Sequence, residues 1–378
     1  MSVPAYPAAR AVAERVHAHF ARHLAIAREA GRAPLAAEPD PDTIEAMIDA
    51  AFWASLRREE GQTPRISLAF VSAAEAGQPI LFTDRLPLRP AALARLAPAV
   101  ERPGIHLGVW RESGELAVWG TTRSIPALCF VVEVIASGLI VIKHRSEAFG
   151  KFVNVAVLEG DQIKIVDEGF SATPECPGPL KSLLGVEAPR GHAGSEVVLV
   201  QLAASMRSHH RGGTLLVVPA ESRTWRESIV EPMLYSVSPP YTDLAEIVER
   251  ERTESASHEW QEDLRRAVDA IAGLTAVDGA TILTDRFELF AFGAKITRRR
   301  GSPPVERVVV TEPIEGAERT VMTPSQLGGT RHLSAAQFVQ DQRDAIALVA
   351  SQDGRFTIFK WSGREDMVHA HRVEALLL

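Results

Sequence analysis

The sequence predicts a mixed α/β (α+β) protein, in which N-terminal helices precede a strand-rich domain and a C-terminal domain with a central mixed sheet flanked by helices. Three observations predict this class. Apolar residues recur at helical spacing near the N-terminus, short β-branched runs begin near residue 65, and helices alternate with strands after a Pro- and Gly-rich stretch at 171–194. We expect a helical segment at 1–62, a strand-rich mixed domain at 63–175 and a further domain at 195–365.

Residues 8–60 are rich in alanine and predict two helices. Val12, Val16 and Phe20 recur every fourth residue and so share one helical face, and Gly31 ends that helix. After a break rich in proline and aspartate, the second helix is expected to begin at a capping Asp42 or Thr43.

The middle region contains a series of short runs of β-branched and aromatic residues, from 65–71 to 162–169, separated by turn residues. The loops at 111–114 and 159–162 predict hairpins, and one helix is expected at 90–100. Because hairpins join antiparallel strands, the sequence predicts a largely antiparallel sheet here.

The C-terminal region alternates helices with strands. A helix over 195–211 leads into the apolar strand 214–219, and a charged amphipathic helix is expected at 259–274. Near the end of the chain, an Asp353-Gly354 turn joins two strands. This alternation predicts a mixed sheet flanked by helices.

Two pairs of segments echo each other: 80–88 with 282–290, and 108–119 with 348–361. Chance similarity between hairpins is the simpler interpretation. If the echo reflects a repeat, the first copy is a structural one without a site, because it has no counterpart of residues 329–332.

Composition argues against several classes of protein. Hydrophobic residues make up 46% and charged residues 24% of the 378 residues, as in a folded chain. A net charge of -7 argues against a broad nucleic-acid surface, and two cysteines are too few for a disulfide framework. No run is apolar enough to span a membrane, and charges interrupt the N-terminal stretch where a signal peptide has its apolar core. We therefore expect a cytoplasmic protein with no membrane and no nucleic-acid partner.

One candidate motif is Asp278-Gly279-Ala280, which stands where a loop enters a predicted strand. Its carboxylate can hold Mg²⁺ against phosphates, and the small residues after it let a ligand approach the backbone. An ordinary Asp-Gly turn explains the same three residues, so this motif alone is weak.

A second motif stands directly before a predicted helix, in the order Gly328-Gly329-Thr330-Arg331-His332. Helix N-termini offer unpaired N–H groups and the positive end of the macrodipole, and both favour a phosphate. Thr330 can cap the helix or bond a phosphate oxygen, Arg331 can bind phosphate with a bidentate fork, and His332 can donate a hydrogen bond or stack on a base. The alternative is that Thr330 only caps the helix while the two basic side chains are solvated.

In this order and spacing the two motifs resemble the nucleotide-binding domain of diadenylate cyclases, which show Asp-Gly-Ala and Gly-Thr-Arg-His-Arg motifs. The resemblance covers roughly residues 195–361, and the whole layout looks most like the DACNV proteins, a predicted sensor group built on the same fold. In the cyclases two domains face each other, each holding one ATP, and metal ions assist the attack of each 3′-hydroxyl on the other α-phosphate. The resemblance implies a nucleotide or cyclic dinucleotide ligand, with Mg²⁺ or Mn²⁺ at Asp278. It also implies these ligand-binding residues: Asp278, Gly279, Ala280, Gly329, Thr330, Arg331 and His332.

The chain departs from the enzyme motifs in ways that bear on catalysis. Leu333 replaces the second arginine, and Gln352 stands where the enzymes carry a carboxylate. Individual preorganised contacts are often worth about 3 kcal/mol in a transition state. We therefore expect a non-catalytic sensor of a nucleotide or nucleotide second messenger. One alternative is an active diadenylate cyclase, a face-to-face homodimer that makes cyclic di-AMP from two ATP. It requires that Leu333 and Gln352 are tolerated or are replaced by residues elsewhere, such as Arg298 to Arg300. The other is a structural or interaction protein on an eroded cyclase fold.

Two smaller groups of basic residues have suggestive spacing. His19 and His23 lie four residues apart on one predicted helix, which can hold a metal, but an exposed pair is the simpler interpretation. Residues 209–211, His-His-Arg, end a helix, where positive charge favours the dipole, and a ligand role is the minority alternative.

Overall fold

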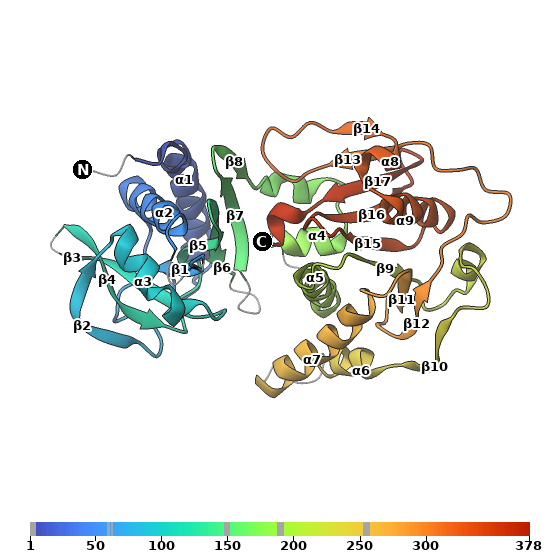
Figure 1. The fold of residues 1–378 in the computed structure, drawn as a ribbon, viewed down its shortest axis with the longest axis horizontal. Helices are drawn as coiled ribbons and strands as arrows, with labels where there is room; N and C mark the ends of the chain where they lie inside the picture. Colours follow the sequence, from blue (N-terminus) through green and yellow to red (C-terminus); the bar gives the residue numbers. More distant parts are fainter. Residues whose placement is uncertain are drawn as a thin grey trace. The chain divides into compact units, whose positions relative to one another are not determined.

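The computed structural model describes residues 5–58, 61, 63–112, 114–146, 152–186, 193–251 and 258–378. The chain divides into two compact units: unit 1 is Met1–Val166 together with Leu378, and unit 2 is Asp167–Leu377. Each unit combines helices with a mixed sheet, so the predicted mixed α/β class is confirmed (Figure 1). Among the described residues, no helix has both the length and the apolar character needed to cross a membrane.

Unit 1 packs its helices against a sheet. Its elements are α1 (Pro7–Glu29), α2 (Pro41–Ser55), β1 (Ile66–Phe70), β2 (Ile80–Pro87), α3 (Pro90–Val100), β3 (His106–Glu112), β4 (Glu115–Thr122), β5 (Phe130–Ala136), β6 (Leu139–Arg145), β7 (Phe152–Glu159) and β8 (Gln162–Ile165). Within the described residues the strand order is β2-β4-β3-β1-β5-β6-β7-β8. Only β1 and β3 are parallel among these neighbours, so the expected largely antiparallel sheet is confirmed.

The start of α2 differs from the prediction. Asp40, rather than Asp42 or Thr43, caps the helix, because its Oδ1 accepts a hydrogen bond from the Thr43 backbone N–H at 2.7 Å. Pro41 takes the first helical position, where its missing N–H is not needed and its fixed φ suits the helix. The proline therefore moves the cap two residues toward the N-terminus.

The alternation of side chains along β1 explains why the sheet of unit 1 has two buried faces. Leu68 belongs to the core that it shares with Val12 of α1 and Met47 of α2. Its neighbour Ala69 points to the other face and belongs to a cluster around Trp119.

We expect His106 to make the protein less stable in acid. Its Nδ1 lies 2.7 Å from the Ser67 hydroxyl, and burial, followed by the charge of Lys143, lowers its pKa from 6.5 to about 4. The unfolded chain binds a proton near the ordinary histidine pKa and the folded chain only near pH 4. The contribution of His106 to the free energy of unfolding is therefore fully present above pH 6.5, and it is lost as the pH falls toward 4. This group should lower the free energy of unfolding by about 2 kcal/mol between about pH 7.5 and pH 5.

Urea unfolding at several pH values checks this expectation, with His106→Gln as the variant that cannot titrate. The variant should lose less stability on acidification than the parent protein. An equal loss in both proteins would show that other groups carry the acid sensitivity.

Unit 2 interleaves helices with a second sheet. Its elements are η1 (Glu168–Ala172), α4 (Gly178–Leu183), α5 (Ala193–Ser208), β9 (Gly213–Val218), η2 (Thr224–Ser228), β10 (Tyr235–Tyr241), α6 (Asp243–Glu251), α7 (His258–Leu274), β11 (Ala280–Thr284), β12 (Leu289–Ala294), β13 (Val308–Thr311), β14 (Thr320–Met322), α8 (Pro324–Leu327), α9 (Thr330–Asp341), β15 (Ile346–Ala350), β16 (Phe356–Ser362), β17 (Met367–Arg372) and η3 (Glu374–Leu376). Over the described residues the strand order is β10-β12-β11-β9-β15-β16-β17-β13-β14. Phe338 of α9 shares a core with Leu216 of β9 and Val349 of β15, which fixes α9 on one face of this sheet.

The two sheets repeat one topology over seven strands. The order β2-β4-β3-β1-β5-β6-β7 in unit 1 matches β10-β12-β11-β9-β15-β16-β17 in unit 2. The match extends to direction, because β1–β3 and β9–β11 are parallel while the other corresponding neighbours are antiparallel. The chain therefore contains the same arrangement of strands twice.

The echoed sequence segments are not the corresponding parts of this repeat. Residues 80–88 include β2, whose counterpart is β10, whereas 282–290 falls in β11 and β12. The units also differ in the connection that follows β4 and its counterpart β12. Unit 1 connects β4 to β5 through residues 123–129 without a helix, whereas unit 2 inserts β13, β14, α8 and α9. The helix α9, which the Gly-Thr-Arg-His motif opens, is therefore part of an insertion into the second copy.

Candidate functional site

A cavity of about 540 Å³ in unit 2 brings the two sequence motifs together. The Asp-Gly-Ala motif enters β11 and the Gly-Thr-Arg-His motif opens α9, and all seven residues predicted to bind a ligand line the cavity. The remaining lining comes from the ends of β9, β12 and β15 and from α9: Thr214, Ala294, Lys295, Ile296, Ser334, Ala350, Ser351 and Gln352. This volume lies within the range of small-molecule pockets.

Asp278 is paired with Lys295, a cavity residue that the sequence analysis missed. The Lys295 ammonium donates to Oδ2 of Asp278, and this hydrogen bond and the lysine charge lower the pKa of the carboxyl group. β11 and β12 are antiparallel, with Ala280 opposite Ala294, so the residue after β12 reaches the residues before β11. That register is the signal that could have identified Lys295. Because both side chains are more than half exposed, the pair is weak and can open for a ligand.

The donor set at Asp278 does not fit a resident divalent ion. Among the described residues that line the cavity, Asp278 is the one carboxylate, and its partner Lys295 is a cation that repels a metal. Magnesium in proteins is held by one or two carboxylates together with the phosphates of a substrate. Mg²⁺ or Mn²⁺ at Asp278 stays a prediction, and it requires a nucleotide to bring the ion and Lys295 to move away.

Gly212, directly before β9, makes room for Arg331. A Cβ atom on Gly212 would lie 3.0 Å from Nη1 of Arg331, and Gly212 has a φ of 70°, which side chains rarely adopt. Arg331 also contributes to the lowered pKa of Asp278, so its charge acts on the same cavity. Gly212 is thus linked to the site through a tertiary contact with Arg331.

The N-terminus of α9 borders the cavity without a side-chain cap from the described residues. Gly329 is the N-cap and Thr330 is the first helical residue, so of the two roles considered for Thr330 the cap is excluded. A glycine cap lacks the side-chain oxygen that commonly accepts from the first N–H groups. The helix terminus therefore keeps the donors and the positive dipole end that favour an anion.

His332 lines the cavity with an imidazole that is buried rather than solvated. Its Nε2 lies 3.4 Å from the Thr357 hydroxyl, its ring meets Phe359 edge-on, and a Cβ atom on Gly328 would lie 2.6 Å from its Cε1 atom. Burial, first of all, lowers the pKa of His332 below its usual 6.5. The ring is therefore mainly neutral at pH 7, and it offers hydrogen bonding rather than charge.

The two departures from the enzyme motifs have different surroundings. Leu333 is 42% exposed and does not belong to the described lining. Gln352 lines the cavity, and its Nε2 donates to the Arg211 carbonyl oxygen at 3.4 Å. The missing carboxylate at Gln352 therefore bears directly on the chemistry of the cavity.

The other basic groups do not line this cavity in the described part of the chain. Nε2 of His209 lies 3.3 Å from the Thr275 hydroxyl, and His209 directly follows the last residue of α5. Arg299 pairs with Glu227 at 2.6 Å. Residues 298–300 therefore do not replace, within this unit, the cation that is lost at Leu333.

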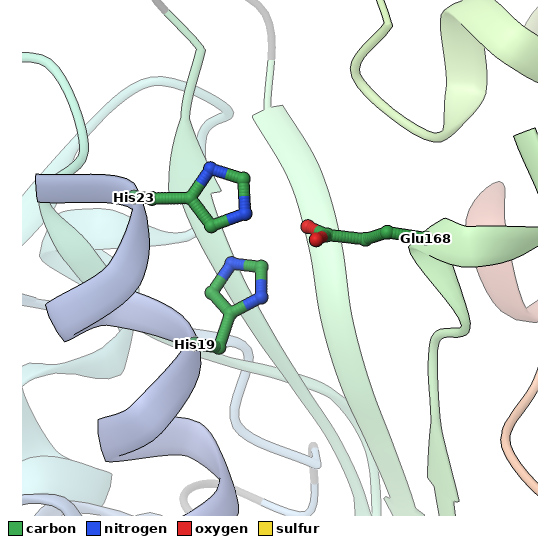
Figure 2. A group of neighbouring side chains, drawn as sticks. All are labelled: His19, His23 and Glu168. Atoms are coloured by element: carbon green, nitrogen blue, oxygen red, sulfur yellow. The ribbon is translucent and has the colours of Figure 1, made fainter. Parts of the chain in front are cut away.

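His19 and His23 project from the same side of α1 in unit 1 (Figure 2). Their ring centroids are 4.4 Å apart, and the ring of His144 on β6 lies 5.4 and 5.7 Å from them. Both residues are half-buried, so the expected exposed pair is wrong. The sheet brings a third imidazole near the pair, which the linear sequence does not reveal.

Comparison with known proteins supports part of the resemblance. The family model described as "Probable sensor domain DACNV" matches residues 33–123, which lie in unit 1 from the approach to α2 to the end of β4. This match supports the resemblance to DACNV proteins and is consistent with a sensor role. The matched residues belong to the half of the chain for which the motifs gave no family. No curated protein matches the chain.

Proposed function

We propose that unit 2 binds the phosphates of a nucleotide or cyclic dinucleotide, and that the protein is a sensor of this ligand without catalysis of its own. One observation carries the proposal: Arg331, Lys295 and the N-terminus of α9 converge on one cavity of about 540 Å³. With Asp278 the three charged side chains give a formal net charge of +1, which favours an anionic ligand. Helix termini, arginine and lysine are the groups that recognise phosphate.

Two features of the cavity favour binding over turnover. Asp278 is held by Lys295, and Gln352 offers an amide in place of a carboxylate. Phosphoryl-transfer enzymes rely on metal ions, held by carboxylates, to neutralise developing charge. A cavity with this donor set can recognise phosphate without activating it.

The test is a thermal-shift panel of ATP, ADP, AMP, cyclic di-AMP and cyclic di-GMP, each with EDTA, Mg²⁺ or Mn²⁺. It runs beside an assay for pyrophosphate and cyclic dinucleotide. A ligand at one hundred times its Kd stabilises the folded protein by about 2.7 kcal/mol. We expect a concentration-dependent shift with at least one compound and no product from ATP.

The other results identify the alternatives. Cyclic dinucleotide formed from ATP would make the protein an active diadenylate cyclase, and its dimerisation would then be measured. Neither shift nor turnover would favour the structural or interaction protein.

Lys295 should make ligand binding independent of a divalent metal. If its ammonium supplies the charge that a metal gives in the cyclases, the parent protein binds equally well in EDTA and in Mg²⁺. Loss of a hydrogen bond to a charged group weakens binding by roughly 1.5–3 kcal/mol, or about 10- to 100-fold. Lys295→Gln should show this loss in EDTA and a smaller loss in Mg²⁺, as measured by calorimetric titration.

Asp278→Asn is the matched control because it removes the partner of Lys295 and keeps the shape of the side chain. It should bind at least as tightly as the parent protein in EDTA, since the ammonium is released for the ligand. Binding that needs Mg²⁺ in the parent protein and disappears in Asp278→Asn would instead place a metal ion at Asp278.

A further inference from the structure

Unit 1 contains a cavity of its own, of about 390 Å³, which none of the motifs predicted. It is bordered by the segment after α1, the loop between β1 and β2, the connection between β4 and β5, and the end of β6. The charged residues of its described lining are Arg32, Glu75 and Arg145. This volume lies within the range of small-molecule sites.

The backbone around this cavity is fixed by hydrogen bonds. The Ala36 N–H donates to the Ala127 carbonyl at 3.0 Å, and the Gly77 N–H donates to the Ser124 carbonyl at 2.8 Å. A Cβ atom on Gly77 would lie 2.6 Å from Cβ of Ser124, so only glycine lets these two loops approach so closely. The cavity is therefore formed before any ligand binds, which lowers the entropy lost on binding.

Arg32 reaches the cavity because of the way in which α1 ends. Gly31 has a φ of 68°, its N–H donates to the Arg28 carbonyl, and the Arg32 N–H donates to the Ala27 carbonyl, both at 3.0 Å. This pair of hydrogen bonds is the Schellman motif, which turns the chain sharply at the end of a helix. The turn places the exposed Arg32 at the rim.

Arg145 is held more firmly. It is the last residue of β6 and is half-buried, and its Nη1 donates to the Ile125 carbonyl at 2.6 Å. Its own carbonyl accepts from the Leu128 N–H at 2.9 Å. A guanidinium has five N–H donors in a rigid plane, so this contact orients the group and leaves further donors to meet an anion.

Two residues beside the cavity adopt a backbone conformation that is unusual for them. Gln78 follows Gly77 with a φ of 53°, and Leu128 follows Ala127 with a φ of 58°. Such conformations are strained for residues with a side chain, and they recur at ligand clamps. Both lie in the loops that border the cavity.

We propose that this cavity binds a small organic anion, with its carboxylate or phosphate group on Arg145 and Arg32 and a hydrogen-bond donor of the ligand on Glu75. Among the described lining residues, two arginines against one glutamate give a net charge of +1, and guanidinium groups match both oxyanions with paired hydrogen bonds. The apolar floor comes from Ala76 and Ile125, which belong to the cluster around Trp119.

The two cavities share no residue: the described lining of the unit 1 cavity lies between Arg32 and Arg145, and that of the unit 2 cavity between Thr214 and Gln352. The inference is therefore independent of the proposed function of unit 2, and it gives the protein a second ligand.

The test is calorimetric titration of the full chain with inorganic phosphate, succinate and glutamate. At least one probe should bind. The affinities for phosphate and for succinate, compared with each other, show whether the site prefers a phosphate or a carboxylate group. Arg32→Ala and Arg145→Lys should each weaken that binding about 10-fold or more, through loss of charge-assisted hydrogen bonds. Glu75→Gln should weaken glutamate more than succinate, because only glutamate carries an ammonium group.

Two control variants separate this site from other basic residues. Arg123→Ala removes an exposed arginine that neighbours Ser124 outside the described lining, and it should leave binding unchanged. Arg331→Ala should leave the binding of succinate and glutamate unchanged, because Arg331 lines the other cavity. Inorganic phosphate is titrated into Arg331→Ala, so that the proposed phosphate site of unit 2 does not contribute. No binding by any probe would overturn the proposal. So would binding that survives Arg32→Ala and Arg145→Lys, or succinate or glutamate binding that disappears in Arg331→Ala.

Discussion

Arg331→Ala is expected to remove the nucleotide-dependent rise in thermal stability. The guanidinium lies against Gly212 at the edge of the unit 2 cavity, beside the N-terminus of α9, where it can meet a phosphate with two hydrogen bonds. Hydrogen bonds to charged groups are worth about 1.5–3 kcal/mol each, so the loss of one or two lowers affinity by about 10- to 10,000-fold. Calorimetric titration with the best compound from the nucleotide panel measures the change.

Two further variants distinguish three contributions of arginine to binding: the planar shape of the Arg331 guanidinium, its positive charge in the cavity, and the overall charge of unit 2. Arg331→Lys keeps the positive charge without the planar fork, so its affinity should fall between those of the parent protein and Arg331→Ala. Arg300→Ala removes an exposed arginine of unit 2 that lies outside the described lining, and it should bind normally. Equal losses in Arg331→Ala and Arg300→Ala would mean that only the overall charge of the unit matters.

Gly279→Ala is expected to destabilise unit 2 even without a ligand. Gly279 has a φ of 115°, and a Cβ atom there would lie 2.6 Å from the carbonyl oxygen of Gly293 and 2.8 Å from its Cα atom, on the neighbouring strand. The backbone strain and the clash together cost about 3 kcal/mol. For a unit of this size this corresponds to a fall in Tm of roughly 6–12 °C.

Gly329→Ala is the matched control from the same cavity. Gly329 has a φ of -75°, and a Cβ atom there would have nothing within 4 Å. Its Tm should stay within about 1–2 °C of the parent value. If phosphate approaches the backbone at this point, Gly329→Ala should nevertheless weaken nucleotide binding. A Tm that falls equally in both glycine variants would contradict the assigned role of Gly279.

The comparison of these glycines shows how the sequence motifs and the structure differ. The Asp-Gly-Ala motif suggests that small residues let a ligand approach, but Gly279 is small because Gly293 of the adjacent strand lies against it. Similarly, Gly328 makes room for the ring of His332 and Gly212 for Arg331. Each packing partner is distant in the sequence or belongs to another element. The sequence of the motif alone therefore does not show why glycine is required at these positions.

The repeated topology was also difficult to predict. The echo between 80–88 and 282–290 suggested a repeat in the wrong register, because it compared β2 with β11 and β12. Strand order depends on which strands pair across the sheet, and alternating apolar residues give the position of a strand but not its neighbours. The repeat therefore becomes visible only when the hydrogen-bonded order of both sheets is known.

By itself, the sequence determined the mixed α/β class, the positions of most helices and strands, and the motif residues that line one cavity of unit 2, from Asp278 to His332. These are local properties, because periodicity, turn residues and helix starts are encoded by neighbouring residues. Only the tertiary structure placed Lys295 against Asp278, buried His332, gave α9 a glycine cap and brought Arg32, Glu75 and Arg145 around the cavity of unit 1. Those arrangements depend on strand register and on where connections cross the sheet. They join residues far apart in the chain, whose proximity no local pattern records.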